Sequence, residues 1–291
     1  MIYEVSHRTV YRYGQPVSIS HHLLHLTPRA AAFQRCRDSA IEIVPAPTVR
    51  TAELDYFGNP ATFVTIQQTH SELVLHALSV IAVDERAAPP PEETPAWEEV
   101  ARRAREDHAP EALEALEFAF ASPHVPILPE TAAYAAACFP PGRPVLAAAR
   151  ELTHRICTDF AYDPTATTLA TGVADAFAMR RGVCQDFAHL ELSCLRAFGL
   201  PARYVSGYLM TRPPPGGERL IGADASHAWL AVWIPGQGWV DLDPTNDMIP
   251  GQEHITVAWG RDYGDVSPVS GVMFGGGAHE VTVSVDVALV R

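Results

Sequence analysis

The sequence predicts an α+β protein in which an all-β domain precedes a longer segment where helices give way to strands. Three observations lead to this prediction. Apolar and polar residues alternate through residues 1–85, and this period of two is typical of strands. Residues 86–96 form a Pro-rich break, after which helix-forming residues become dense. Strand-like alternation returns after Pro201, toward the end of the chain.

Four segments of the first region are predicted to be strands: 2–13, 40–44, 61–68 and 72–83. Turn signals separate them, such as Phe57-Gly58-Asn59-Pro60 between the second and the third. Several short strands in series indicate a small β-sandwich. We therefore expect a β-sandwich domain at 1–85 and a linker at 86–96.

Residues 97–291 are expected to form a helical segment that continues into a second folded core. The predicted helices are 97–108, 111–122 and 143–157, the last with Pro144 near its start. The predicted strands are 202–210, 226–234, 238–243 and 280–290. Between the first two of these strands, the Pro- and Gly-rich stretch 213–218 predicts a mobile loop.

The composition indicates a globular protein and argues against two classes of partner. The chain has 291 residues, of which 47% are hydrophobic and 19% are charged, so it has enough apolar residues for a sizeable core. Acidic residues outnumber basic residues by 34 to 21, which gives a net charge of -13. No long basic run is interleaved with aromatic residues. We therefore expect no binding of nucleic acid and no attraction to an anionic membrane surface.

The cysteines and the N-terminal stretch favour the cytoplasm. Five cysteines without a regular spacing argue against a disulfide framework and fit a reducing compartment. There is no CxxC pair, so a structural zinc site is not expected. The first residues alternate and carry charge, unlike a signal peptide, and no run reaches the roughly 18 apolar residues of a membrane span. We expect a cytoplasmic protein that needs no metal or cofactor.

One cysteine lies where a helix is predicted to begin. Apolar residues recur with helical spacing at Val183, Phe187, Leu190, Cys194 and Phe198, and Gly199 and Pro201 end the pattern. Cys184 is therefore in the first helical turn, where unpaired backbone N–H groups favour a thiolate and could also bind an oxyanion. The alternative is a thiol that is only packed, as expected for Cys194 on the apolar face.

A base and its orienting carboxylate are predicted on a hairpin. The strands 226–234 and 238–243 flank the tight-turn sequence Pro-Gly-Gln-Gly, so their far ends lie side by side. This places His227 near Asp243, although Asp241 also satisfies the strand parity. A carboxylate beside an imidazole fixes its tautomer and stabilises the imidazolium. Taken singly, His227 could instead be a histidine satisfied inside a strand, and Asp243 could form an Asx-type turn.

Three segments in this order carry a resemblance to a known family. GVCQDFAHL, SHAWLAVW and GWVDLDPTND are similar to the motifs of the transglutaminase-like core, a papain-like Cys-His-Asp fold. LPARYVSGYL resembles the first strand of that core. DYFGNP and GRDYGDVSPVSG resemble segments of bacterial transglutaminase-like proteins. The resemblance implies a papain-like core, with helices packed on an antiparallel sheet, preceded by the β-sandwich.

The resemblance also implies roles for the site residues. At the matching motif positions, Cys184 is the nucleophile, His227 is the general base, and Asp243, immediately before Pro-Thr, is the orienting residue. Gln185 stands where the animal crosslinking enzymes have a tryptophan, and their calcium-binding loops are not recognisable here. The chain is thus nearer to the bacterial branch described as cysteine protease-like.

We therefore expect a cysteine-dependent acyl-transfer enzyme that cleaves amide bonds, as a peptidase or amidase, with a peptide or protein as substrate. The alternatives are a transglutaminase, which passes a glutamine acyl group to an amine, and a non-catalytic scaffold on the same fold. Tyr162 is the candidate for a second oxyanion donor; its alternative role is a buried aromatic. Asp186 is either a favourable charge at the helix N-terminus or an anchor for a substrate amine. Gln185 is a further candidate for binding the oxyanion or the substrate. Three other residues could line the cleft or belong to the core: Tyr204, Ser206 and Trp229.

Two polar clusters have other possible roles. The stretch 21–25 holds three histidines, but His22 and His25 would point to opposite faces of a strand, which disfavours a metal site. The acidic residues of 261–265 could bind a cation or an amine, and a solvated loop is the simpler reading.

Overall fold

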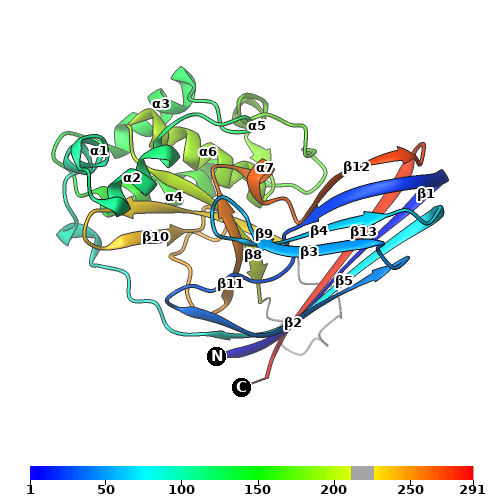
Figure 1. The fold of residues 1–291 in the computed structure, drawn as a ribbon. Helices are drawn as coiled ribbons and strands as arrows, with labels where there is room; N and C mark the ends of the chain where they lie inside the picture. Colours follow the sequence, from blue (N-terminus) through cyan, green and yellow to red (C-terminus); the bar gives the residue numbers. More distant parts are fainter. Residues whose placement is uncertain (211–225, 291) are drawn as a thin grey trace, which may run out of the picture.

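In the computed structural model, a strand-rich part lies beside a part in which helices cover a second sheet (Figure 1). The structure describes residues 1–210 and 226–290, so the loop predicted at 213–218 lies outside the described residues. The antiparallel sheets and the separate group of helices confirm the predicted α+β class.

The first sheet is built around one long strand. β1 spans Ile2–Leu24, and its pairing with β5 is irregular between Arg12 and Val17. The half before this irregularity is flanked by two strands, β5 (His70–Val83) and β13 (His279–Leu289). The other half is flanked by β4 (Pro60–Ile66) and β12 (Val269–Gly275). The outer strands are β2 (Gln34–Val44) beside β5 and β3 (Val49–Leu54) beside β4.

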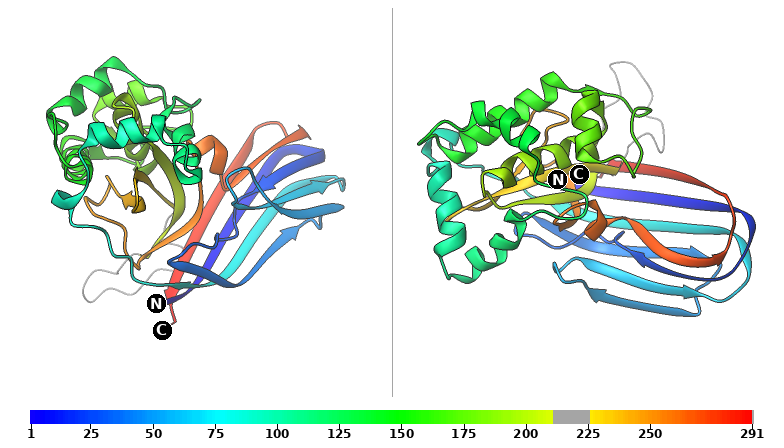
Figure 2. Two further views of the ribbon diagram at one scale, coloured as in Figure 1. Left: turned by 60° about the vertical axis from the view of Figure 1, so that its left-hand side comes forward. Right: turned by 90° about the horizontal axis from the view of Figure 1, so that it is seen from above.

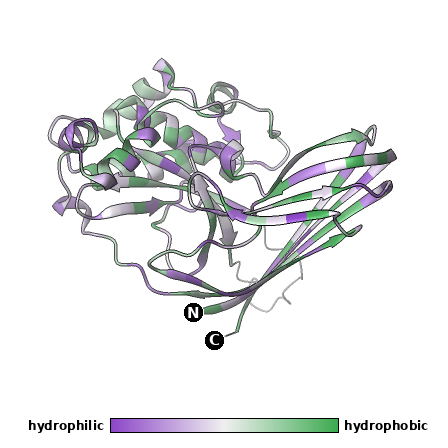
Figure 3. Cartoon of the chain, in the orientation of Figure 1, coloured by the Kyte–Doolittle hydropathy of each residue, from purple (hydrophilic) through white to green (hydrophobic). Residues whose placement is uncertain are grey.

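The two halves of this sheet, on either side of the irregularity in β1, form two layers. These layers pack together as a sandwich that shares β1. Val64 and Ile66 of β4 lie in one hydrophobic cluster with Leu73 and Leu75 of β5. Buried and more exposed positions alternate along β5 from Leu73 to Ile81, and the strands in Figure 3 carry bands of both hydropathies. This alternation is what made the strands visible in the sequence.

The last two strands of the chain lie in the same sheet as the first one. β13 pairs with β1 from Tyr3↔Leu289 to Tyr13↔His279, and the backbone N–H of Val290 donates to the carbonyl of Ile2 at 2.8 Å. The two termini therefore lie together in both views (Figures 1 and 2). The predicted C-terminal segment, 97–291, includes the strand at 280–290. The structure pairs this strand with the N-terminal sheet, because alternation predicts a strand but not its partner.

The second sheet has the strand order β10-β9-β8-β11. Its strands are β8 (Ala202–Leu209), β9 (Ser226–Ile234), β10 (Gly238–Leu242) and β11 (His254–Gly260). The helices are α1 (Trp97–Glu106), α2 (Pro110–Leu116), α3 (Pro129–Ala135), α4 (Val145–Asp159), α5 (Val173–Met179), α6 (Cys184–Ala197) and α7 (Tyr263–Val266). A two-residue parallel pair, β6 (Ala161–Tyr162) and β7 (Arg181–Gly182), precedes α6.

Several elements differ from the sequence prediction. The helix predicted at 111–122 ends at Leu116 and continues only as a 3-10 turn, Glu117–Ala119. Among the described residues, eight helices and strands were not predicted: α3, α5, α7, β3, β6, β7, β11 and β12. β3 is exposed along its whole length, so it lacks the apolar alternation that marks the other sandwich strands.

Helix α6 lies at the centre of the core and is buried on every side. The sequence shows one apolar face, but Asp186–Arg196 are all buried. The polar side chains on the other faces have partners: Ser193 donates to the carbonyl of Pro126 at 2.6 Å, and Arg196 donates to that of Ala202 at 2.9 Å. Gly199, in a left-handed conformation at φ +70°, follows the helix as predicted. The surrounding layers hold the N-terminus of α6 in a fixed position.

Buried polar contacts fix the sandwich against β11. The Gln34 side chain donates to the carbonyl of Thr256 at 2.7 Å and accepts from its N–H at 2.9 Å. Asn59, from the turn predicted at 57–60, makes the same paired contact with the backbone of Trp259 at 2.8 and 2.9 Å. The two parts of the chain therefore keep one relative orientation, and the cleft between them is pre-formed.

Candidate active site

The N-terminus of α6 presents Cys184 at a partly exposed position directly after β7. Asp186 accepts hydrogen bonds from the backbone N–H of Val183 at 2.8 Å and from the Thr167 hydroxyl at 2.7 Å. A Cβ at Gly182 would lie 2.6 Å from the Asp186 carboxylate, so glycine is needed for this close approach. Asp186 is buried and caps the helix, an arrangement that fits the electrostatic role.

His227 lies between Cys184 and Asp243. Its Nε2 atom is 2.7 Å from Oδ2 of Asp243, and its ring also hydrogen-bonds the Cys184 side chain. Since Nε2 faces the carboxylate, Nδ1 is the atom left for the thiol. The structure thus brings together the three residues predicted from the sequence, in the order thiol, imidazole, carboxylate.

The hairpin register explains why Asp243 and not Asp241 reaches the imidazole. Asp241 pairs with Ala231 and Leu242 pairs with Leu230, so the next position, Asp243, lies one diagonal step from His227 on the same face. Both aspartates lie on the same face of the hairpin as His227. Only Asp243 is far enough from the turn to reach the imidazole.

The electrostatics favour a charged imidazole at this site. Burial lowers the pKa of His227, but hydrogen bonds and charge interactions with Asp243 and Cys184 outweigh it and raise the pKa above its ordinary value. Burial raises the pKa of Asp243, but hydrogen bonds from His227 and His254 outweigh it and hold the pKa below its usual range. An imidazolium beside a thiol at a helix N-terminus stabilises the thiolate.

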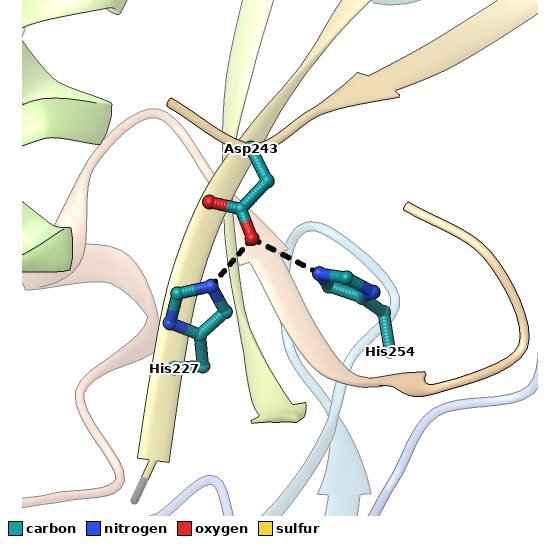
Figure 4. Close-up of side chains that lie close together, drawn as sticks. All are labelled: His227, Asp243 and His254. Carbon is teal, nitrogen blue, oxygen red and sulfur yellow. Dashed lines mark hydrogen bonds and ion pairs between the residues drawn. The ribbon is translucent and has the colours of Figure 1, made fainter. Parts of the chain in front are cut away.

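Sequence reasoning missed His254. This residue of β11 is fully buried, and its Nε2 lies 3.0 Å from the same Oδ2 atom of Asp243 (Figure 4). A carboxylate oxygen only accepts, so both imidazoles donate to it. Nδ1 of His254 has no partner, which fits a neutral ring with its proton on Nε2. No sequence pattern marks a histidine eleven residues after the aspartate, because the contact depends on how β11 is placed.

Asn246 is a second residue that sequence reasoning missed. Its side-chain amide donates to Oδ2 of Asp243 at 2.7 Å, while the backbone N–H of Thr245 donates to Oδ1 at 2.9 Å. Both residues follow Asp243 in the DPTND turn, so the turn itself could have indicated them.

Among the described residues, His227, Asp243 and His254 are also the group whose ligand-type atoms, all within 4.8 Å, could hold a metal. The shared hydrogen bonds to Asp243 account for this spacing.

Asp241, the competing carboxylate, belongs to a supporting network behind the site. It accepts from Nε1 of Trp229 at 3.0 Å and pairs with the guanidinium of Arg86. The Trp229 ring packs edge-on against His254 with a centroid distance of 5.2 Å. Trp229 is fully buried and lies outside the lining of the cleft, so it supports His254 and does not line the substrate space.

A cleft of about 580 Å³ opens at Cys184, between the core and the sandwich. Four of the other predicted residues line it: Tyr162, Gln185, Tyr204 and Ser206. Tyr204 and Ser206 are largely buried in the floor, whereas Tyr162 is 57% exposed. Burial, followed by the charge interaction with Cys184, raises the pKa of Tyr162, and both residues line the cleft.

The two polar clusters have structural partners. Asp262 accepts from the backbone N–H of Gly264 at 2.8 Å as the N-cap of α7, and Asp265 forms an ion pair with Arg261 at 2.9 Å. His22 and His25 are both buried, and His25 lies 3.2 Å from the carboxylate of Asp55.

Two family models match the chain. Residues 3–82 match the bacterial transglutaminase-like N-terminal region, and residues 132–244 match the transglutaminase-like superfamily. An uncharacterized protein of Mycobacterium tuberculosis is 43% identical over 296 residues, covering 98% of this chain and 92% of its own. The chain belongs to the transglutaminase-like superfamily. The predicted family is therefore confirmed, and it is a family of cysteine-dependent enzymes.

Two further comparisons bear on this member of the superfamily. A "Putative Cysteine Protease" from Cytophaga hutchinsonii superposes with a TM-score of 0.80 at 19% identity, covering 100% of this chain and 91% of its own, so the two share a fold. A protein-glutamine gamma-glutamyltransferase of Pseudomonas aeruginosa is 39% identical over 99 residues, which is 31% of this chain and 15% of its own. None of the helices within residues 1–210 and 226–290 combines the length and apolar character needed to cross a bilayer.

Proposed function

We propose that the protein is a cysteine hydrolase that cleaves amide bonds through a thioester acyl-enzyme, as a peptidase or amidase. The observation that supports it is the hydrogen-bonded series Cys184, His227 and Asp243 at the edge of an open cleft. The same three groups constitute a nucleophile, a general base and an orienting residue in acyl transfer.

In this proposal, the Cys184 thiolate adds to the amide carbonyl and forms a C–S bond. The backbone N–H of Cys184 and the Tyr162 hydroxyl hold the developing oxyanion. The His227 imidazolium gives its proton to the leaving amine as the C–N bond breaks, and a thioester remains. The neutral His227 then takes a proton from water, which attacks the thioester; the C–S bond breaks, the acid is released, and the Cys184 thiolate and the His227 imidazolium are restored.

Transamidation is the second candidate, because an amine can replace water in the last step. The similarity to a protein-glutamine gamma-glutamyltransferase over 99 residues favours this alternative. Release of ammonia from a glutamine peptide, with an amine incorporated in equal amount, would support it. Hydrolysis with no amine product would support the peptidase or amidase. A scaffold without activity is the third possibility, and the presence of all three triad residues counts against it.

We also propose a peptide or protein substrate, no nucleic-acid or membrane partner, and a cytoplasmic location. All five cysteines are free, which suits a reducing compartment. The net charge of -13 disfavours polyanionic partners.

The first test of the function is alkylation of the native protein by iodoacetamide at pH 4–9, with each cysteine followed by mass spectrometry. Burial raises the pKa of the other four thiols, Cys36, Cys138, Cys157 and Cys194. We expect Cys184 to react first, well below pH 8, and His227→Ala to remove that advantage. If Cys184 reacts no faster than Cys36 or Cys157, the enzyme proposal fails and the scaffold is favoured.

A further inference from the structure

One wall of the active-site cleft comes from the β-sandwich. Tyr11 of β1, Val269 of β12, and Val281 and Val283 of β13 line the cleft that contains Cys184. Tyr11 pairs with Val281, and Thr9 pairs with Val283, so these side chains share one face of the sheet. The sandwich therefore adds an apolar surface to the space where a substrate meets the nucleophile.

Val281 and Val283, on the face of the sandwich that is turned toward the cleft, are unusually exposed. Val281 is 45% and Val283 is 51% exposed, although both point into a cleft. A ligand that buries this surface gains about 25 cal/mol per Å² of apolar surface removed from solvent.

The histidine at the core end of this wall does not add a positive charge. His7 is buried, and its Nδ1 lies 2.9 Å from the hydroxyl of Tyr208 while its Nε2 lies 3.2 Å from that of Thr9. Burial, and then the charge of His76, lowers the pKa of His7 to about 4. The ring is therefore neutral at pH 7, and its hydrogen bonds are directed to the protein.

The wall continues into a second hollow of about 230 Å³ at the bend of β1. The hollow shares Tyr11, Val269 and His279 with the cleft, so the two spaces are adjacent. Its rings are clustered: Tyr11 stacks with Tyr13 at a centroid distance of 6.2 Å, and His279 lies 6.0 Å from Tyr13. An apolar side chain that enters from Cys184 would meet Val281, Val283, Tyr11 and Val269 in the cleft, and Tyr13 and Met273 in the hollow.

We propose that the sandwich wall formed by Tyr11, Val269, Val281 and Val283 is a subsite for an apolar side chain of the acyl-donor peptide. This inference rests on the proposed function and adds the substrate class to it. The occupant is a peptide side chain because the wall is continuous with the cleft of the nucleophile. In this arrangement the core carries out the chemistry and the sandwich selects the substrate.

The test uses the full chain and three affinity labels: acetyl-Leu-Leu, acetyl-Glu-Glu and acetyl-Lys-Lys chloromethyl ketone. In each, the Cys184 thiolate displaces chloride, so a C–S bond replaces the C–Cl bond. The rate of alkylation at Cys184 is divided by the rate with iodoacetamide, which reports the intrinsic reactivity of the thiol. The Lys-Lys label is needed because the net charge of -13 repels Glu-Glu in any case. We expect the Leu-Leu label to react at least tenfold faster than both charged labels.

A pair of matched variants assigns this preference to the wall. Relative to the iodoacetamide rate of the same variant, Val281→Asp is expected to slow the Leu-Leu label about tenfold and to speed the Lys-Lys label. Val49→Asp is the control, because Val49 lies on β3 and is also 45% exposed; it should change none of the three rates.

Two results would overturn the inference in distinguishable ways. If iodoacetamide labels Cys184 rapidly but Leu-Leu reacts no faster than Lys-Lys, or Val281→Asp behaves as Val49→Asp does, the subsite is wrong and the proposed function stands. If iodoacetamide labels Cys184 no faster than the other thiols, the proposed function fails and the subsite fails with it.

Discussion

Nε2 of His254 lies 3.0 Å from Oδ2 of Asp243, on the oxygen that also accepts from His227 at 2.7 Å. One carboxylate oxygen thus connects two imidazoles from different strands, β9 and β11. The position of Asp243, and through it that of His227, depends on a residue that lies outside the sequence motifs.

His254 is therefore expected to act as a positioning residue. His254→Leu removes one donor from Asp243, so the pKa of that carboxyl rises toward its ordinary value and His227 is held less firmly. We expect the rate of Cys184 alkylation at pH 6 to fall about tenfold, as second-sphere changes commonly do. The acid limb of the pH–rate profile should also move to higher pH.

The variant His254→Gln distinguishes a positioning role of His254 from a contribution to folding alone. His254→Gln keeps a side-chain N–H that can donate, and should recover most of the rate and the original pH profile. A merely structural role would give two variants with lower stability but wild-type pH profiles, and that result would contradict the prediction.

The pairing of His227 with Asp243 predicts a specific dependence of stability on pH. The pKa of Asp243 is lower in the folded protein than its unfolded value of 3.8, so this group adds to the free energy of unfolding above pH 3.8. That contribution is lost as the pH falls through the folded pKa. The pKa of His227 is higher in the folded protein than its unfolded value of 6.5, so its full contribution to the free energy of unfolding is present below pH 6.5. That contribution is lost as the pH rises through the folded pKa. Asp243→Asn should therefore lower the free energy of unfolding most near pH 5, by about 3 kcal/mol. Urea unfolding at pH 5, 7 and 9 measures this, and an equal cost at pH 5 and 9 would contradict it.

Glu191 predicts a further loss of stability as the pH rises. This residue of α6 is fully buried, accepts from the Thr153 hydroxyl at 2.8 Å, and has one oxygen without a partner. Burial raises its pKa to about 8, so the folded protein keeps a proton that the unfolded chain releases above pH 4.5. Stability should therefore fall as the pH rises from 4.5 to 8.

Glu191→Gln removes this titration and keeps the acceptor for Thr153. At pH 8.5 the variant should unfold with a free energy at least about 1 kcal/mol above that of the wild type. At pH 4 the two proteins should be nearly equal. Thermal unfolding at both pH values is the measurement, and a variant that is less stable at pH 8.5 would show that the carboxylate has a partner when ionised.

The role of Tyr162 can be separated from the reactivity of the thiol. Tyr162→Phe should lower acylation by p-nitrophenyl acetate roughly 10²-fold, because the oxyanion loses a donor. Alkylation by iodoacetamide forms no oxyanion, so its rate should not change. If both reactions keep the wild-type rate, Tyr162 is not an oxyanion donor.

Asp186 is expected to matter for stability through the start of α6. Asp186→Ala leaves the backbone N–H of Val183 and the Thr167 hydroxyl without their acceptor. The loss should be about 1 kcal/mol, typical of a helix cap. Asp186→Asn keeps an acceptor oxygen and should lose less; a loss equal to that of alanine would mean that the charge, and not the hydrogen bond, stabilises the helix N-terminus.

The sequence by itself determined the features that local pattern encodes. Helical spacing from Val183 to Phe198 placed Cys184 in the first turn of a helix, and the Pro-Gly-Gln-Gly turn brought His227 and Asp243 to the same end of a hairpin. These contacts join residues of one element or of adjacent elements, so periodicity and turn chemistry suffice to predict them.

Tertiary structure alone decided the features that depend on pairing between distant segments. His254 reaches Asp243 because β11 pairs with β8, and Val281 reaches the cleft because β13 pairs with β1. Alternation marks a strand but does not specify its partner or register, and a shift of one residue would turn each side chain to the opposite face. The grouping of Cys184, His227 and Asp243 could therefore be predicted from the sequence, while the support of Asp243 and the wall of the cleft could not.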